Sequence, residues 1–169
     1  MNDTHAHRAA RGAAIVRVHL CEAPTHQSIE DRILRGLHYA NEVHTTDADP
    51  LYEGTMALRD ALTDVLHHAD GWYTPDTILD SALLAVEKLP AGWAEQYRDY
   101  QTASTARPVK VHAATDTRAR SAVVGTVTEI LMAAAHYGET ATALADAAEE
   151  RFRDEAESAR FAAVRDARK

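Results

Sequence analysis

The chain has little of what builds large cores, disulfides or membrane spans. Leu, Ile, Val and Phe make up 31 of its 169 residues, whereas Ala, at 34, is the commonest residue and buries little apolar area. A single cysteine excludes an intrachain disulfide and a four-thiolate zinc site, which favours a reducing cytoplasm. No stretch approaches the ~18–20 apolar residues of a membrane span. The basic stretch from His7 to Arg11 leads into only a few apolar residues before Arg17, so we expect no secretory signal.

Positive charge and glycine are also scarce. The net charge is −8, and residues 21–105 carry 15 acids against 5 bases, while residues 1–20 and 106–137 are each mildly basic. An acidic protein of this kind is a poor binder of duplex DNA, because phosphate contacts require a dense positive footprint. The seven glycines are scattered singly, so no phosphate-binding loop is present. A weak nucleic-acid-binding regulator is therefore only a second alternative function, and it would use Arg8, Arg11, Arg17, Lys110, Arg118 and Arg120.

Hydrophobic periodicity predicts a mainly α fold, an irregular bundle of five or six helices. Cap signals such as Ser28, Asp49-Pro50 and Thr74-Pro75 mark helix starts, and Gly71 and Gly138 mark helix ends. The predicted helices cover residues 29–44, 50–69, 75–89, 91–101, 115–137 and 139–165. We expect a flexible N-terminal arm over 1–13, a single helical domain over 14–150 and a charged C-terminal helix extension over 151–169.

Two short segments have a different pattern. Residues 15–19 and 108–112 both alternate apolar and polar side chains with β-branched residues, and both contain Val, a basic residue, Val and His in succession. They are either two strands that pair or two unrelated extended segments.

Acidic residues gather on one face of the predicted helix 50–69. Glu53, Asp60, Asp64 and His67 fall on this face, opposite Leu58, Leu62 and Val65. We expect a solvent-exposed face, because the leucine side is the natural core. The alternative is a site for Mg²⁺, a cation that prefers oxygen ligands, in a metal-dependent hydrolase of nucleotides or phosphoesters. No other cofactor is expected.

The segment from Asp60 to Leu89 loosely resembles the helix-turn-helix half of all-α nucleotide pyrophosphohydrolases. In that family two pairs of acids, each spaced three residues apart, hold magnesium. Here Ala61 stands where the second pair requires an acid, and no Glu-x-x-Glu pair occurs upstream. Because both metal motifs are incomplete, we do not assign the family.

Glu129 is the one charged residue between Ser121 and Gly138. His136 and Arg118 fall on the same helical face, which makes these three the weak catalytic candidates. A carboxylate on a nearly apolar helix is costly unless it is paired. We therefore expect Glu129 to be buried with Arg118, His136 or a base from another helix. The alternative is a pocket acid with a raised pKa.

Further candidates concern zinc and partner binding. His19, Cys21 and His26 form a cluster that lacks the fourth ligand of a structural zinc site, so we interpret it as an ordinary loop with a buried thiol. The aromatic residues of 72–100 are core or interface anchors. A stripe of small residues on the last helix includes one large side chain, Phe152. The interface candidates are Trp93, Tyr97, Tyr100 and Phe152.

Together these observations favour a cytoplasmic helical protein of the interaction, assembly or regulatory class. No intact catalytic constellation is visible, so the sequence leans away from an enzyme. The expected partner is either a second copy of the chain, in a homodimer, or another protein. We do not expect a membrane as a partner.

Overall fold

A computed structural model describes residues 4–22, 28–44, 54–99 and 116–167. This part of the chain folds into seven α-helices and one short 3-10 helix, and it contains no strand. The predicted mainly α bundle is therefore confirmed. The elements are α1 (Thr4–Glu22), α2 (Ile29–His44), α3 (Thr55–Ala69), α4 (Pro75–Glu87), α5 (Trp93–Gln96), α6 (Arg120–Ala133), η1 (Ala134–Tyr137) and α7 (Ala141–Asp166).

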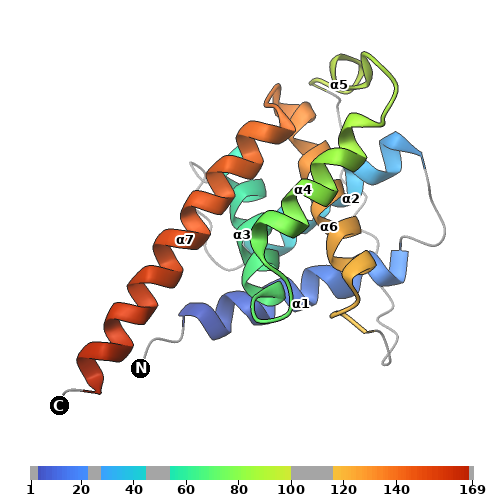
Figure 1. The fold of residues 1–169 in the computed structure, drawn as a ribbon. Coiled ribbons are helices and arrows are strands. Elements are labelled where there is room, and N and C mark those ends of the chain that lie inside the picture. The colour runs from blue at the N-terminus through green and yellow to red at the C-terminus, as the bar shows by residue number, and fades with distance from the viewer. Residues whose placement is uncertain (1–3, 23–27, 45–53, 100–115, 168–169) are drawn as a thin grey trace.

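Helices α3 and α6 form the centre of the bundle (Figure 1). Helix α3 packs against α1, α2 and α7, and α6 packs against α2 and α4. Both central helices are buried over most of their length. The core is built from leucine, isoleucine, valine and alanine side chains, with Tyr39 as its largest fully buried member. The scarce large apolar residues are thus concentrated on two helices that every other long helix contacts.

Local signals account for most helix ends. The Ser28 hydroxyl accepts a hydrogen bond from the backbone N–H of Asp31 at 3.0 Å, and the Thr74 hydroxyl accepts one from Thr77 at 3.4 Å. Thr140 caps α7 in the same way. Gly138 has a φ of 71°, the left-handed conformation that a helix C-terminus often requires. The predicted start at Asp49-Pro50 lies outside the described residues, and α3 begins at Thr55.

Helix α1 corrects two expectations about the N-terminal region. Residues 15–19, expected to be extended either as one strand of a pair or as an unrelated segment, lie inside α1, and the other segment, 108–112, lies outside the described residues. The predicted arm over 1–13 is helical from Thr4. Arg8, Gly12, Ile15 and Val16 are buried at helical spacing, and packing of this face on α3 favours the helix over an extended conformation.

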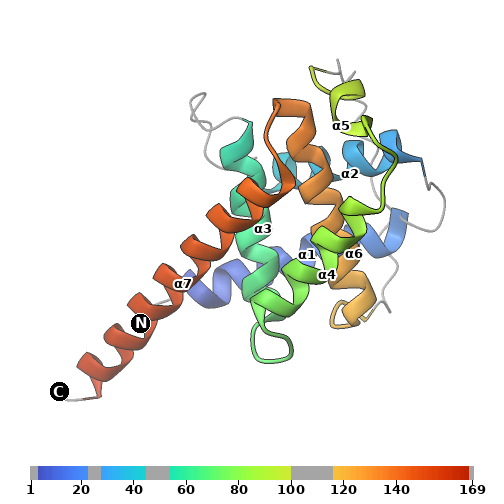
Figure 2. The ribbon, with the colours of Figure 1, turned by 45° about the horizontal axis from the view of Figure 1, so that its top comes forward.

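Helix α7 has two unlike halves, and it continues through residue 151 without a break. Leu144, Ala145, Ala148 and Phe152 of its first half are buried against the bundle. Its C-terminal half runs out beyond the other helices, as both views show (Figures 1 and 2). None of the helices in the described ranges is long and apolar enough to cross a membrane.

Candidate functional site

The carboxylate of Glu129 lies at the centre of a buried ion cluster. It is 2% exposed and projects from α6 toward α1 and α2. Arg35 donates to its Oε1 from Nε at 3.0 Å and from Nη2 at 2.7 Å. Tyr39 donates to Oε2 at 2.7 Å, and Nδ1 of His19 lies 3.0 Å from the same atom. One acid therefore connects three helices through hydrogen bonds.

Two glycines allow the helices around Glu129 to approach closely. A Cβ at Gly36 of α2 would lie 2.2 Å from the backbone oxygen of Glu129. A Cβ at Gly125 of α6 would lie 2.6 Å from Nε2 of His19. The distance at Gly36 is to backbone and is too short for any side chain, so the backbone contact between α2 and α6 depends on glycine at position 36. At Gly125 the neighbour is instead the ring of His19.

The surroundings of Glu129 stabilise its charged form. Burial by itself raises the pKa of this carboxyl group, but the hydrogen bonds from His19, Arg35 and Tyr39 outweigh burial and hold the pKa below its ordinary value. The prediction of a buried, paired Glu129 is confirmed. The alternative of a pocket acid with a raised pKa is wrong.

Arg118 and His136 lie away from this cluster. The Arg118 guanidinium stacks over Trp72 at 4.4 Å from the ring centroid, and the His136 ring meets Tyr137 edge-on at 4.8 Å. Arg118 and His136 are therefore not the partners of Glu129. The third predicted partner, a base from another helix, is observed, as Arg35 of α2 and His19 of α1. The three catalytic candidates are not brought together.

A second ion cluster joins α1 to α3. Asp64 is fully buried, and Nη1 of Arg8 lies 2.7 Å from its Oδ1. Arg11 contacts both oxygens, with Nε 2.8 Å from Oδ2 and Nη2 3.0 Å from Oδ1. Burial raises the pKa of Asp64 against the opposing effect of Arg11 and Arg8. A Cβ at Gly12 would lie 2.1 Å from the Asp64 backbone oxygen, so the two helices also touch through their backbones.

Glu155 extends the second cluster to α7. Arg8 contacts both its carboxylate oxygens at 2.8 and 2.6 Å, and Nε2 of His67 lies 3.1 Å from Oε2. The other ring nitrogen of His67 lies 2.8 Å from Nδ1 of His5. Burial lowers the pKa of His67, with the Glu155 bond opposing it. Burial raises the pKa of Glu155, but hydrogen bonds and charge from Arg151, Arg8 and His67 outweigh it and lower the pKa.

The expected solvent-exposed acidic face of α3 is therefore wrong. Asp60, Asp64 and His67 are 5%, 0% and 2% exposed, because α1 and α7 cover this side of the helix. Asp60 pairs with Arg151 of α7. Each carboxylate thus faces arginine rather than a second acid, which disfavours a cation site. Across the described ranges no three His, Cys, Asp or Glu side chains are grouped to hold a metal ion, and Glu53 lies outside those ranges.

Three of the basic residues expected to contact nucleic acid are engaged within the chain. Arg8 and Arg11 are engaged by Asp64, and Arg120 donates to the Ser81 hydroxyl at 2.9 Å. Lys110 lies outside the described residues. Arg8, Arg11 and Arg120 therefore have partners within the chain.

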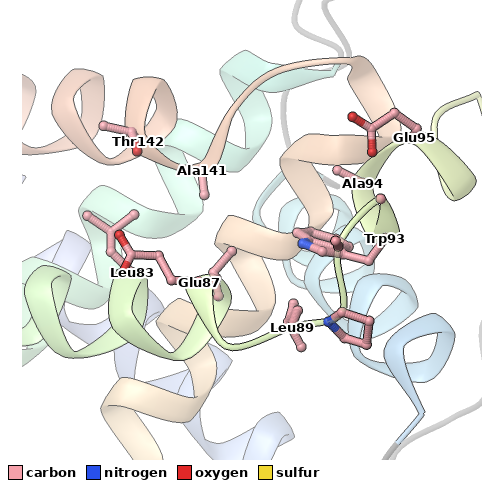
Figure 3. A pocket seen from close by; sticks show the side chains of 12 residues that line it. Leu83, Glu87, Leu89, Trp93, Ala94, Glu95, Ala141 and Thr142 are labelled. Atoms are coloured by element: carbon pink, nitrogen blue, oxygen red, sulfur yellow. The ribbon is translucent and has the colours of Figure 1, made fainter.

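A cavity of about 350 Å³ lies between the end of α4, α5 and the start of α7 (Figure 3). Leu83, Leu89 and Trp93 supply its apolar lining, and Glu87 and Glu95 supply carboxylates. The α7 N-terminus at the same cavity favours anions, whereas the carboxylates favour cations. Because these preferences oppose each other, the lining selects no single class of ligand.

The described interface candidates pack mainly against other residues of the same chain. Trp93 and Tyr97 are half-buried against the core, and Tyr100 lies outside the described residues. Phe152 is 7% exposed, and its ring centroid lies 4.7 Å from that of His67. The large side chain of the small-residue stripe therefore fills the α3–α7 contact.

The exposed apolar side chains of α7 are ones that the sequence analysis did not select. Phe161 is 68% exposed and Val164 is 52% exposed. Phe161 lies off the stripe of small residues that includes Phe152. Phe161 could have been identified from the sequence, because it is a large apolar residue on the face of a charged helix opposite to Phe152.

Comparison with known proteins returned no relative: no family model, curated protein or solved structure matches this chain.

Proposed function

We propose that this chain is a cytoplasmic helical interaction or assembly protein that forms a homodimer through the second half of α7. The observation that carries the proposal is the exposure of Phe161 and Val164, at 68% and 52%, near the end of a long helix. Large apolar side chains that protrude from a projecting element are typical anchors of protein interfaces.

The exposed face is separate from the face that holds α7 in the bundle. Phe161 follows Phe152 by nine residues, which at about 100° per residue is half a turn around the helix axis. Phe152 points into the bundle, so Phe161 points away from it. A partner can bind this face while Glu155 and its arginine partners keep α7 attached to the body.

A second copy of the chain is the simplest partner for this face. Every copy presents the same protruding side chains, and a two-fold contact requires only that the surface be complementary to itself. The two ion clusters support this assignment indirectly. Their buried charges are engaged inside the chain, and they stabilise the helix arrangement from which the end of α7 projects.

The test is the mass of the chain in solution across micromolar concentrations, measured by sedimentation equilibrium. We expect the wild type to shift from monomer to dimer, and Phe161→Ser to remain a monomer over the same range. Leu84→Ser is the matched control, because Leu84 is 50% exposed on α4 and lies on the body rather than on the projecting helix.

Circular dichroism checks that both variants keep the helical content of the wild type. A wild-type chain that stays monomeric throughout this range would overturn the proposal. A Phe161→Ser variant that dimerises as well as the wild type would also do so.

A further inference from the structure

The outward face of α7 changes charge along its length. At about 100° per residue, the face within about 60° of Phe161 carries acids on one side of this residue and a base on the other. All of these side chains are exposed. From the N-terminal end, the charged and large apolar side chains of this face are Asp146, Glu150, Asp154, Glu157, Phe161, Val164 and Arg165.

From this pattern we propose that the homodimer is antiparallel, with Asp154 of each chain beside the partner's Arg165. The inference rests on the proposed dimer and adds its orientation. In a parallel pair Asp154 would face the partner's Asp154 and Glu157, and each base would face the same base. An antiparallel pair centred on Phe161 instead brings acids against bases at both ends of the contact.

The spacing of the charged residues fits this arrangement. Asp154 lies seven residues before Phe161, and Arg165 lies four residues after it. In an antiparallel pair centred on Phe161, Asp154 of one chain and Arg165 of the other are therefore offset by three residues, or about 4.5 Å along the helix axis. Both lie on the same flank of Phe161, at about +20° and +40° on the helical wheel. A flexible arginine side chain spans such an offset.

The projection of α7 also suits an antiparallel contact. The second half of the helix extends away from the other helices (Figure 2). When two such ends overlap in opposite directions, each body lies beyond the end of the partner's helix. A parallel overlap would place the two acidic bodies next to each other, which is unfavourable for a chain of net charge −8.

Charge reversal distinguishes the two orientations. In the antiparallel dimer, Asp154→Arg and Arg165→Asp should each raise the dimer Kd by about tenfold or more, which corresponds to about 1.4 kcal/mol. An equimolar mixture of the two variants should regain wild-type affinity as a heterodimer, because every cross-chain pair is then of opposite sign. The chain that carries both substitutions should regain it as a homodimer.

The control is Asp80→Arg, which makes the same charge change at an exposed position on α4. A parallel dimer would respond to Asp154→Arg in the opposite sense, because the repulsion between Asp154 and the partner's Glu157 would become attraction and tighten association. That result overturns the antiparallel assignment but not the proposed function. A dimer Kd that is unchanged by both substitutions does the same. A wild-type chain that never dimerises overturns the proposed function itself.

Discussion

Replacing Glu129 with alanine should lower the free energy of unfolding by about 3–5 kcal/mol, the usual cost of removing one partner from a buried ion pair. Arg35 is 7% exposed and Tyr39 is fully buried, so neither can recover its lost hydrogen bonds from water. The guanidinium of Arg35 would lose both of its hydrogen bonds to the carboxylate, at 3.0 and 2.7 Å. The loss of these charge-assisted bonds, rather than the lost side-chain volume, should dominate the effect.

A double-mutant cycle isolates the charge. Arg35→Met should cost about 3 kcal/mol, because it leaves the carboxylate of Glu129 with fewer donors. Glu129→Gln should cost a similar amount, because the amide keeps the shape but not the charge. Together the two substitutions should cost at least about 2 kcal/mol less than the sum of the single effects, since the neutral amide can still accept from Tyr39 and His19.

Urea unfolding followed by circular dichroism measures each free energy, provided that the denaturant slope is unchanged. Glu95→Gln is the control, because Glu95 is exposed and should change stability by no more than about 0.5 kcal/mol. Additive effects in the cycle, or a cost below about 1 kcal/mol for Glu129→Ala, would refute the buried ion pair as the source of stability.

The remaining predictions concern helix contacts, the second ion cluster and pH. Gly12→Ala and Gly36→Ala should each destabilise the fold by about 1–3 kcal/mol or more in urea unfolding, although alanine favours helices, because a Cβ would clash with backbone; stabilisation by either would refute the close contact. Asp64→Ala should cost about 3 kcal/mol, because it removes the carboxylate that Arg8 and Arg11 contact, and a cost below about 0.5 kcal/mol would restore the solvent-exposed interpretation. The pKa of His67 is lowered by burial, so the unfolded chain binds its proton first and stability should fall as pH drops below about 6.5. Because interactions with Arg151, Arg8 and His67 outweigh burial and lower the pKa of Glu155, a further loss should follow below about pH 4.3, with Asp64 opposing it through its raised pKa. Thermal melts across this range check both steps, and a constant Tm between neutral pH and about pH 5 would contradict the His67 step.

The amino-acid sequence predicted the features that depend on neighbouring residues in the chain. Apolar spacing and caps located the helix at 29–44 and the start of the helix at Pro75, because these signals act within one or two turns. The absence of other charges around Glu129 predicted its burial, since an unpaired carboxylate in an apolar helix is too costly.

The sequence left the partners of the charged residues undetermined. An exposed acidic face and a buried ion cluster have the same residue pattern on α3. Only the ion pairs that Arg8 and Arg11 of α1 and Arg151 of α7 make with this face distinguish the two. The alternating segment in α1 is equally ambiguous, because its β-branched residues suit a strand or a buried helix face. The tertiary structure decided both points, because the energy of a charge or an apolar side chain depends on what packs against it from distant parts of the chain.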